Sequence, residues 1–123
     1  MNGYLLDTHI LLWAWQRPEN IPSRLLPVLS SDAPFHVSMA SFWEIAIKVS
    51  SGKLITVSEP FVKAAETNLK VLDIRAEHVS AVQHLPFRHR DPFDRMLIAQ
   101  AQVEKLTILT ADRNFAAYDV MLA

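Results

Sequence analysis

The chain has 123 residues, a length that suits one domain, and half of them are hydrophobic, which is enough for a buried core. It contains no cysteine, which excludes disulfides, thiolate metal sites and a cysteine nucleophile. The formal net charge of −1 lacks the basic excess common in nucleic-acid-binding proteins, so any surface for nucleic acid must be local. The first residues lack the pattern of a secretory signal, and no apolar run approaches the ~20 residues of a membrane span. We therefore expect a soluble, cytoplasmic protein with no membrane partner.

Short apolar runs alternate with segments of helical pattern through the first half of the chain. Gly52 stands where one helix should stop, and Ser58 is the expected N-cap of the next helix, with Pro60 early in its first turn. In chain order we predict a strand at residues 4–6, a helix at 9–16, a helical stretch at 22–31, a strand at 35–38, a helix at 41–51 and a helix that opens at 58–60.

The second half continues the same alternation. In chain order we predict a strand at residues 71–74, a helix at 76–85, a helix from 91 to about 105, a strand at 106–110, a short helix at 113–116 and a last edge strand at 120–122. The two glycines of the chain, Gly3 and Gly52, cannot form a glycine-rich phosphate-binding loop.

This alternation predicts an α/β fold, in which a parallel sheet is covered by helices on both faces. The predicted strands are continuous apolar runs, as buried parallel strands are. Ligands of such sheets bind beyond the carboxyl ends of the strands, so the residues that follow each strand are where we expect the chemistry.

Four acids are predicted to lie at that edge of the sheet. Asp7 directly follows the first strand, and Asp112 comes two residues after the strand that ends at Thr110. Glu44 and Asp94 are expected in the first turns of helices that begin at the same edge. Converging carboxylates raise one another's pKa unless a cation lies between them, and hard oxygen ligands suit Mg²⁺ or Mn²⁺. With a phosphate substrate, the chemistry would be metal-assisted phosphodiester hydrolysis.

Each acid also has an ordinary structural explanation. Asp7 and Asp112 are each suited to cap the helix that follows. Glu44 is suited to an ion pair with the lysine four residues later, which is worth about 0.3–0.5 kcal/mol. Asp91 and Asp94 are suited to act as a capping pair, a role that we adopt for Asp91 and leave open for Asp94. The functional interpretation depends on all four acids mapping to one edge.

Four segments of the sequence resemble the motifs of PIN domains, specifically of their VapC-like branch. Residues 5–13 (LLDTHILLW) resemble the opening motif, and residues 38–45 (SMASFWEI) resemble the second, a serine-rich turn before a glutamate. Residues 89–101 are similar to the third motif in its Asp-Pro-Phe-Asp form, and residues 109–115 to the fourth. The motifs occur in family order over nearly the whole chain, and no acidic position departs from the pattern.

The resemblance implies a single PIN-like nuclease domain over residues 1–123, folded as a three-layer α/β/α sandwich with a short central parallel sheet. It also implies an acidic pocket for one or two Mg²⁺ or Mn²⁺ ions and endonuclease activity on RNA. As a toxin of a type II toxin–antitoxin pair, the chain would form a homodimer and bind a cognate antitoxin that blocks the pocket. The catalytic and metal-binding residues carried over are Asp7, Glu44, Asp94 and Asp112, with Asp91 and Asp119 as further candidate ligands.

Three hydroxyl residues and one further acid are expected to support these ligands. Thr8, Ser41 and Thr110 each lie beside an acid in the sequence and are suited to hydrogen-bond a carboxylate or metal-bound water, as is Asp91. Helix capping and strand-end hydrogen bonding are the alternatives for each hydroxyl.

Basic residues next to the acids provide a local surface for RNA. These side chains are predicted to hold RNA phosphates beside the pocket, or else to form an ordinary solvated loop. They are Arg88, His89, Arg90, Arg95 and Arg113.

The helix at residues 9–16 is apolar nearly all round, although packing on one face of a sheet requires only one apolar stripe. The apolar side chains beyond that stripe, including one of the two tryptophans of the helix, are predicted to face a dimer mate or an antitoxin. Ordinary core packing is the alternative.

Other classes of protein fit the strand-end acids less well. Haloacid-dehalogenase-like phosphatases need a second Asp two residues after the first, where His9 stands, and receiver-type domains have a strand-end Lys where Thr110 stands. The remaining alternative is a PIN-like fold that binds RNA or a partner protein without cutting, which the four intact acids oppose.

Overall fold

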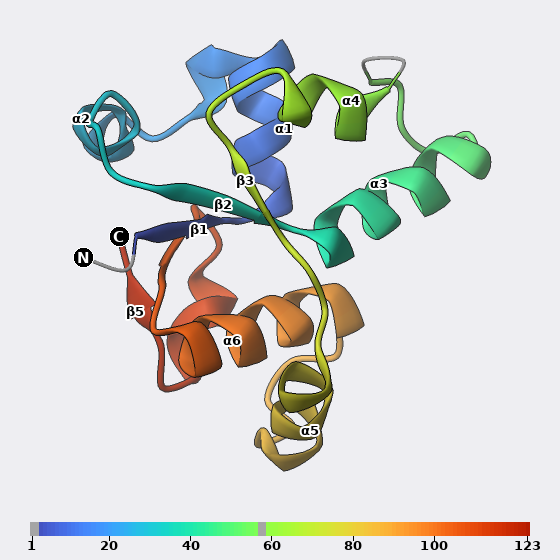
Figure 1. Ribbon diagram of the computed structural model, residues 1–123, viewed down its shortest axis with the longest axis vertical. Helices are drawn as coiled ribbons and strands as arrows, with labels where there is room; N and C mark the ends of the chain where they lie inside the picture. The colour runs from blue at the N-terminus through green and yellow to red at the C-terminus, as the bar shows by residue number, and fades with distance from the viewer. Residues whose placement is uncertain (1–2, 57–58) are drawn as a thin grey trace.

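Five parallel strands form the centre of the molecule (Figure 1). The computed structural model describes residues 3–56 and 59–123, and within them the strands pair in the order β3-β2-β1-β4-β5. Every pairing in this sheet is parallel, as the alternation of strands and helices predicts. The strands are β1 (Tyr4–Leu6), β2 (Phe35–Ser38), β3 (Lys70–Leu72), β4 (Thr107–Leu109) and β5 (Met121–Leu122).

Helices cover both faces of the sheet, with α1 and α4 on one side and α5 and α6 on the other (Figure 1). The α-helices are α1 (Thr8–Gln16), α2 (Leu26–Leu29), α3 (Met39–Ser50), α4 (Pro60–Ala65), α5 (Ala76–His84) and α6 (Pro92–Glu104). The 3₁₀ helices are η1 (Pro18–Asn20), η2 (Ser23–Leu25) and η3 (Arg113–Ala117).

Alternate residues of the central strands feed two hydrophobic cores. Leu5 and Ile108 belong to the core beneath α5 and α6, whereas Leu6 and Leu109 belong to the core beneath α1, α3 and α4. This alternation follows from the two-residue period of a strand, which sends successive side chains to opposite faces. The predicted three-layer α/β/α sandwich is therefore confirmed.

The start of α3 differs from the sequence prediction. Helix α3 begins at Met39, because the Oγ of Ser38 accepts a hydrogen bond from the backbone N–H of Ala40 (2.9 Å) and so caps the helix two residues earlier than expected. The prediction that Glu44 lies in the first turn is therefore wrong, and Glu44 lies in the second turn. Helix α4 begins at Pro60, and the predicted cap Ser58 lies outside the described residues.

The stretch predicted as helical at residues 22–31 is split into η2 and α2. Pro27 lies in the first turn of α2, where its missing N–H costs no intrahelical bond. None of the helices in the described ranges is both long and apolar enough to cross a membrane.

Gly3 is required at the entry to β1. Its φ is +100°, and a Cβ built there would lie 2.5 Å from the carbonyl oxygen of Pro34, which also accepts the backbone N–H of Tyr4 at 2.9 Å. Any side chain at this position would therefore strain the backbone and push away Pro34, the residue that precedes β2.

We predict that Gly3→Ala lowers the free energy of unfolding by about 1–3 kcal/mol, because it adds both backbone strain and a backbone clash. Urea unfolding followed by circular dichroism measures the loss. Gly52→Ala is the matched control, because Gly52 also has a positive φ (+75°) but no described atom lies within 4 Å of its added Cβ. Equal losses in the two variants would contradict the role assigned to the Pro34 contact.

Candidate active site

The parallel pairing of β1 with β4 brings two of the predicted acids together. Asp7 follows β1, and its backbone N–H donates to Leu109 at the end of β4 (3.0 Å). The hydroxyl of Thr110 donates to Oδ2 of Asp7 (2.8 Å) and accepts the backbone N–H of Asp112 (2.9 Å). One hydroxyl therefore fixes the position of both acids.

The buried carboxylate of Asp7 is not used as a helix cap. Asp7 stands at the N-cap position of α1 and is 3% exposed, but its side chain makes no capping hydrogen bond. Asp112, by contrast, accepts the backbone N–H of Asn114 through Oδ1 (2.9 Å) and so caps η3 with one oxygen. Because Asp7 makes no capping hydrogen bond, its carboxylate remains available as a ligand. Capping uses only one oxygen of Asp112, so the other oxygen also remains available.

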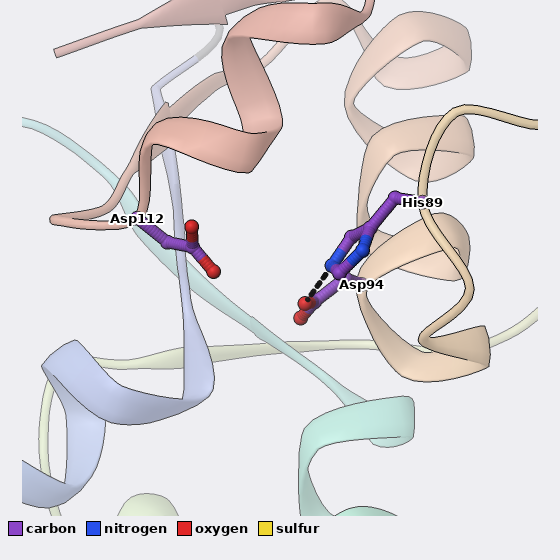
Figure 2. A group of neighbouring side chains, drawn as sticks. All are labelled: His89, Asp94 and Asp112. Carbon is purple, nitrogen blue, oxygen red and sulfur yellow. Dashed lines mark hydrogen bonds and ion pairs between the residues drawn. The ribbon is translucent and has the colours of Figure 1, made fainter.

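The start of α6 supplies the third acid together with a histidine. Asp91 caps the helix, since its Oδ1 accepts the backbone N–H groups of Phe93 (2.9 Å) and Asp94 (3.1 Å). Nε2 of His89 lies 2.8 Å from Oδ2 of Asp94. Figure 2 shows the carboxylates of Asp94 and Asp112 directed toward one another, and one ligand atom from each of His89, Asp94 and Asp112 lies within 4.8 Å of the others.

Glu44 lies in the second turn of α3 and is 4% exposed. Its Oε2 accepts a hydrogen bond from Nζ of Lys48 (2.9 Å), whereas its buried Oε1 has no hydrogen-bond partner among the described residues. The hydroxyl of Thr8 donates to the hydroxyl of Ser41 (2.8 Å) and ties the start of α1 to the start of α3. These two hydroxyls therefore bond each other, and only Thr110 bonds an acid directly.

The charges of these groups act on one another. Burial raises the pKa of Asp94 to about 6, and repulsion from Asp91 and Asp7 adds to the shift, while the hydrogen bond from His89 opposes it. Burial likewise raises the pKa of Asp7, against the lowering effect of the Thr110 hydrogen bond. The hydrogen bond to Glu44 raises the pKa of Lys48, and the negative charges of Asp91 and Asp94 contribute. Lys48, which bonds Glu44, therefore also lies within electrostatic reach of the two acids at the start of α6.

The donor set fits a hard divalent cation. It offers the ligand atoms of His89, Asp94 and Asp112, which lie within 4.8 Å of one another, together with the carboxylate of Asp7 and the buried Oε1 of Glu44, which has no partner among the described residues. A pocket of about 240 Å³ lined by Asp7, His9, Trp13, Ala111 and Asp112 opens beside them. A bound cation would offset the repulsion and burial that raise the pKa values of the acids.

The predicted basic residues fall into two groups. Arg88, Arg90 and Arg113 are exposed. Arg95 is only 8% exposed, and its guanidinium donates to the carbonyl oxygens of Pro86 (3.0 Å) and Val82 (3.3 Å) and to the hydroxyl of Tyr118 (3.1 Å). Arg95 thus holds the segment before α6 against the fold, and we withdraw it from the predicted RNA surface, because its donors are used internally.

Asp119, a further candidate ligand from the sequence, lies away from the acids. It lines a different pocket with Lys105 and Leu106, which precede β4, and therefore lies toward the amino edge of the sheet. Its carbonyl oxygen accepts the side-chain amide of Gln102 (3.0 Å). It is therefore not part of the acidic cluster.

Three residues have a role at the site that the sequence argument did not give them. His89 contacts an acid directly, Lys48 is within electrostatic reach of Asp91 and Asp94 as well as bonded to Glu44, and Arg24 donates to the carbonyl oxygen of Thr110 (3.1 Å). Lys48 had a signal in the sequence, because it lies one turn after Glu44 on a helix that begins at the carboxyl edge. No signal in the sequence pointed to Arg24, because it is 86 residues from Thr110 along the chain.

The tryptophans of α1 have roles within the chain. Trp13 lines the pocket beside Asp7, and the ring of Trp15 lies 5.8 Å from the ammonium of Lys63 in α4. Both rings are partly buried in the core on that side of the sheet. Part of the apolar excess predicted for a partner is therefore used in the fold.

A sequence model of the PIN domain matches residues 4–121. The chain belongs to the PIN domain family. Members of this family are generally nucleases, and the acidic cluster described above is in keeping with that chemistry. No curated protein sequence matches the chain.

Solved structures of other PIN-fold proteins have the same architecture. A chain of VapBC2 from Rickettsia felis, solved with a promoter DNA fragment, has a TM-score of 0.73 at 17% identity, covering 98% of this chain and 96% of that one. DNA-bound VapBC from Salmonella typhimurium gives 0.69 at 18% identity, with 100% and 98% covered. A toxin–antitoxin complex from Klebsiella pneumoniae gives 0.67 at 17% identity, with 98% and 97% covered. These similarities establish the fold.

We predict that Asp94 makes the metal-free protein less stable as the pH rises. The folded chain holds the Asp94 proton more tightly (pKa about 6, against 3.8 as the ordinary value), so the free energy of unfolding falls as that proton is lost. Between pH 4 and pH 6 the loss attributable to Asp94 is about 2 kcal/mol. Urea unfolding in EDTA, compared with Asp94→Asn, measures it. Parallel pH profiles for the two proteins would contradict the prediction.

Proposed function

We propose that this PIN-domain protein is a metal-dependent endoribonuclease and the toxin of a toxin–antitoxin pair. The observation that carries the proposal is the group of His89, Asp94 and Asp112, whose ligand atoms lie within 4.8 Å of one another, with Asp7 close enough to raise the pKa of Asp94 and with a buried Glu44 oxygen that has no partner among the described residues. A buried carboxylate oxygen without a donor is costly, and a cation would compensate it.

Mg²⁺ or Mn²⁺ bound there would act as a Lewis acid and lower the pKa of water. Asp7, Asp112 and Glu44 would hold the ion, and Asp94 would share in holding it. Asp94 also has one oxygen that does not contact His89, and this oxygen is suited to orient the attacking water and accept its proton. Glu44 is the alternative proton acceptor, in which case its Oε1, which has no partner among the described residues, would face the water instead of the ion. No side chain need act as nucleophile, the RNA 2′-hydroxyl need take no part, and the expected products carry a 5′-phosphate.

RNA is proposed to lie along the exposed basic residues beside the acids. Arg88 and Arg90 precede the start of α6, and Arg113 directly follows Asp112. Guanidinium groups at these positions are suited to bind the phosphates that flank the cleaved bond, with His89 nearby. This local surface makes RNA binding compatible with a net charge of −1.

The toxin assignment is supported by the structural neighbours, which come from VapBC and toxin–antitoxin complexes. By that similarity we infer a cognate antitoxin that covers the acidic pocket and a homodimer of the toxin. The other candidate is a PIN-like module that binds RNA or a protein without cutting, and the donor set of the cluster opposes it.

We predict that the wild-type chain, folded and free of antitoxin, cuts a labelled pool of structured RNA in Mg²⁺ or Mn²⁺. Cleavage should be lost in EDTA, because the cation is removed, and in Asp7→Asn, because a buried ligand loses its charge. Gel electrophoresis of the products and a test for 5′-phosphate ends provide the measurement. Chelator-resistant cleavage would overturn the mechanism, and failure to bind either metal would favour the non-catalytic module.

We predict that Arg90→Ala weakens RNA binding and reduces its dependence on salt, because one phosphate contact and its released counterion are lost. Fluorescence anisotropy in the Asp7→Asn background measures binding without cleavage. Arg17→Ala is the matched control, since Arg17 is also exposed but follows the far end of α1 from Asp7. Unchanged binding by Arg90→Ala would remove this surface from the proposal.

A further inference from the structure

A cation of the chain itself lies within the acidic cluster. Nζ of Lys48 is 2.9 Å from Oε2 of Glu44, and this carboxylate is 5% exposed whereas the lysine side chain is 42% exposed. The ammonium therefore approaches a buried carboxylate from the solvent side. Asp91 and Asp94, from the start of a different helix, also act on its charge.

This pair differs from an ordinary i,i+4 ion pair on a helix surface. Such pairs join two solvated side chains and contribute about 0.3–0.5 kcal/mol. Here the carboxylate is buried, so removing its only described partner would leave an uncompensated charge. Lys48 thus supplies positive charge to Glu44 and lies within electrostatic reach of Asp91 and Asp94.

The two oxygens of Glu44 are in different situations. Oε2 is occupied by Lys48, whereas Oε1 is buried and has no hydrogen-bond partner in the described part of the chain. A carboxylate in a two-ion nuclease site can bridge ions about 3.5–4 Å apart, one on each oxygen. In this chain one of the two positions beside Glu44 is already filled by an ammonium.

We propose that Lys48 occupies the position of a second metal ion on Oε2 of Glu44, so that the site binds a single divalent cation on the side of Oε1, Asp7, Asp94 and Asp112. The inference rests on the proposed metal-dependent function and specifies its site. The ammonium then supplies the fixed positive charge that a second ion supplies elsewhere, and it does so without dissociating. Lys48 is accordingly a positioning residue that holds Glu44.

The test is the number of Mn²⁺ ions bound per chain, measured at neutral pH by electron paramagnetic resonance of free Mn²⁺ during titration of the full chain. Wild type and Lys48→Arg should each bind one ion, because both keep a cation on Glu44. Lys48→Met should bind two, because Oε2 is freed. The double variant Lys48→Met with Glu44→Gln should return to one. Lys53→Met, which removes an exposed lysine from the segment after α3, should bind one ion.

Two ions in the wild type, or one ion in a Lys48→Met chain whose circular dichroism is native, would overturn the inference while leaving metal-dependent cleavage intact. No ion in any variant would overturn the proposed metal-dependent function and this inference with it. The counts therefore separate failure of the Lys48 role from failure of the function.

Discussion

The parallel pairing of β1 with β4 is the constraint on which the site depends. It brings Asp7 next to Thr110, 103 residues later in the chain, and the hydrogen bond between them fixes a buried carboxylate. Asp112 is positioned by the same hydroxyl. Because β1 and β4 are central strands with helices on both faces, Asp7 is only 3% exposed, and the hydrogen bond from Thr110 limits how far its carboxylate can move away from its neighbours.

Burial of acids at this edge has an energetic cost that the rest of the fold must offset. Burial raises the pKa of Asp94 to about 6, which means that folding makes the charged form of this carboxylate, the form that a ligand requires, harder to reach than in the unfolded chain. Apolar burial in the two cores opposes this cost, and a bound cation would remove much of it. The fold is therefore stable enough to bury these carboxylates, but the site needs added positive charge to offset the cost of burying them.

The sequence predicts the order of elements and the edge at which the acids lie, because strand and helix periods and strand-end positions are local properties. It does not predict which way a long side chain turns. Arg95 and Arg90 look alike in the sequence, yet Arg95 is buried against carbonyl groups and Arg90 is exposed. Likewise, Ser38 rather than a later residue begins α3, because a hydroxyl cap depends on backbone geometry that the apolar pattern does not reveal.

Charge at the site is balanced locally rather than over the whole chain. A net charge of −1 averages over basic residues that serve different purposes: Arg95 stabilises the fold, and Lys48 pairs with a buried acid. With Glu44 paired to Lys48 and Asp94 bonded to His89, the single divalent cation that we propose would bring the charge of the cluster near neutrality. A near-neutral centre flanked by exposed arginines would attract an RNA phosphate, whereas four uncompensated carboxylates would repel it. The number of cations bound among the carboxylates therefore also determines whether the site attracts or repels an RNA phosphate.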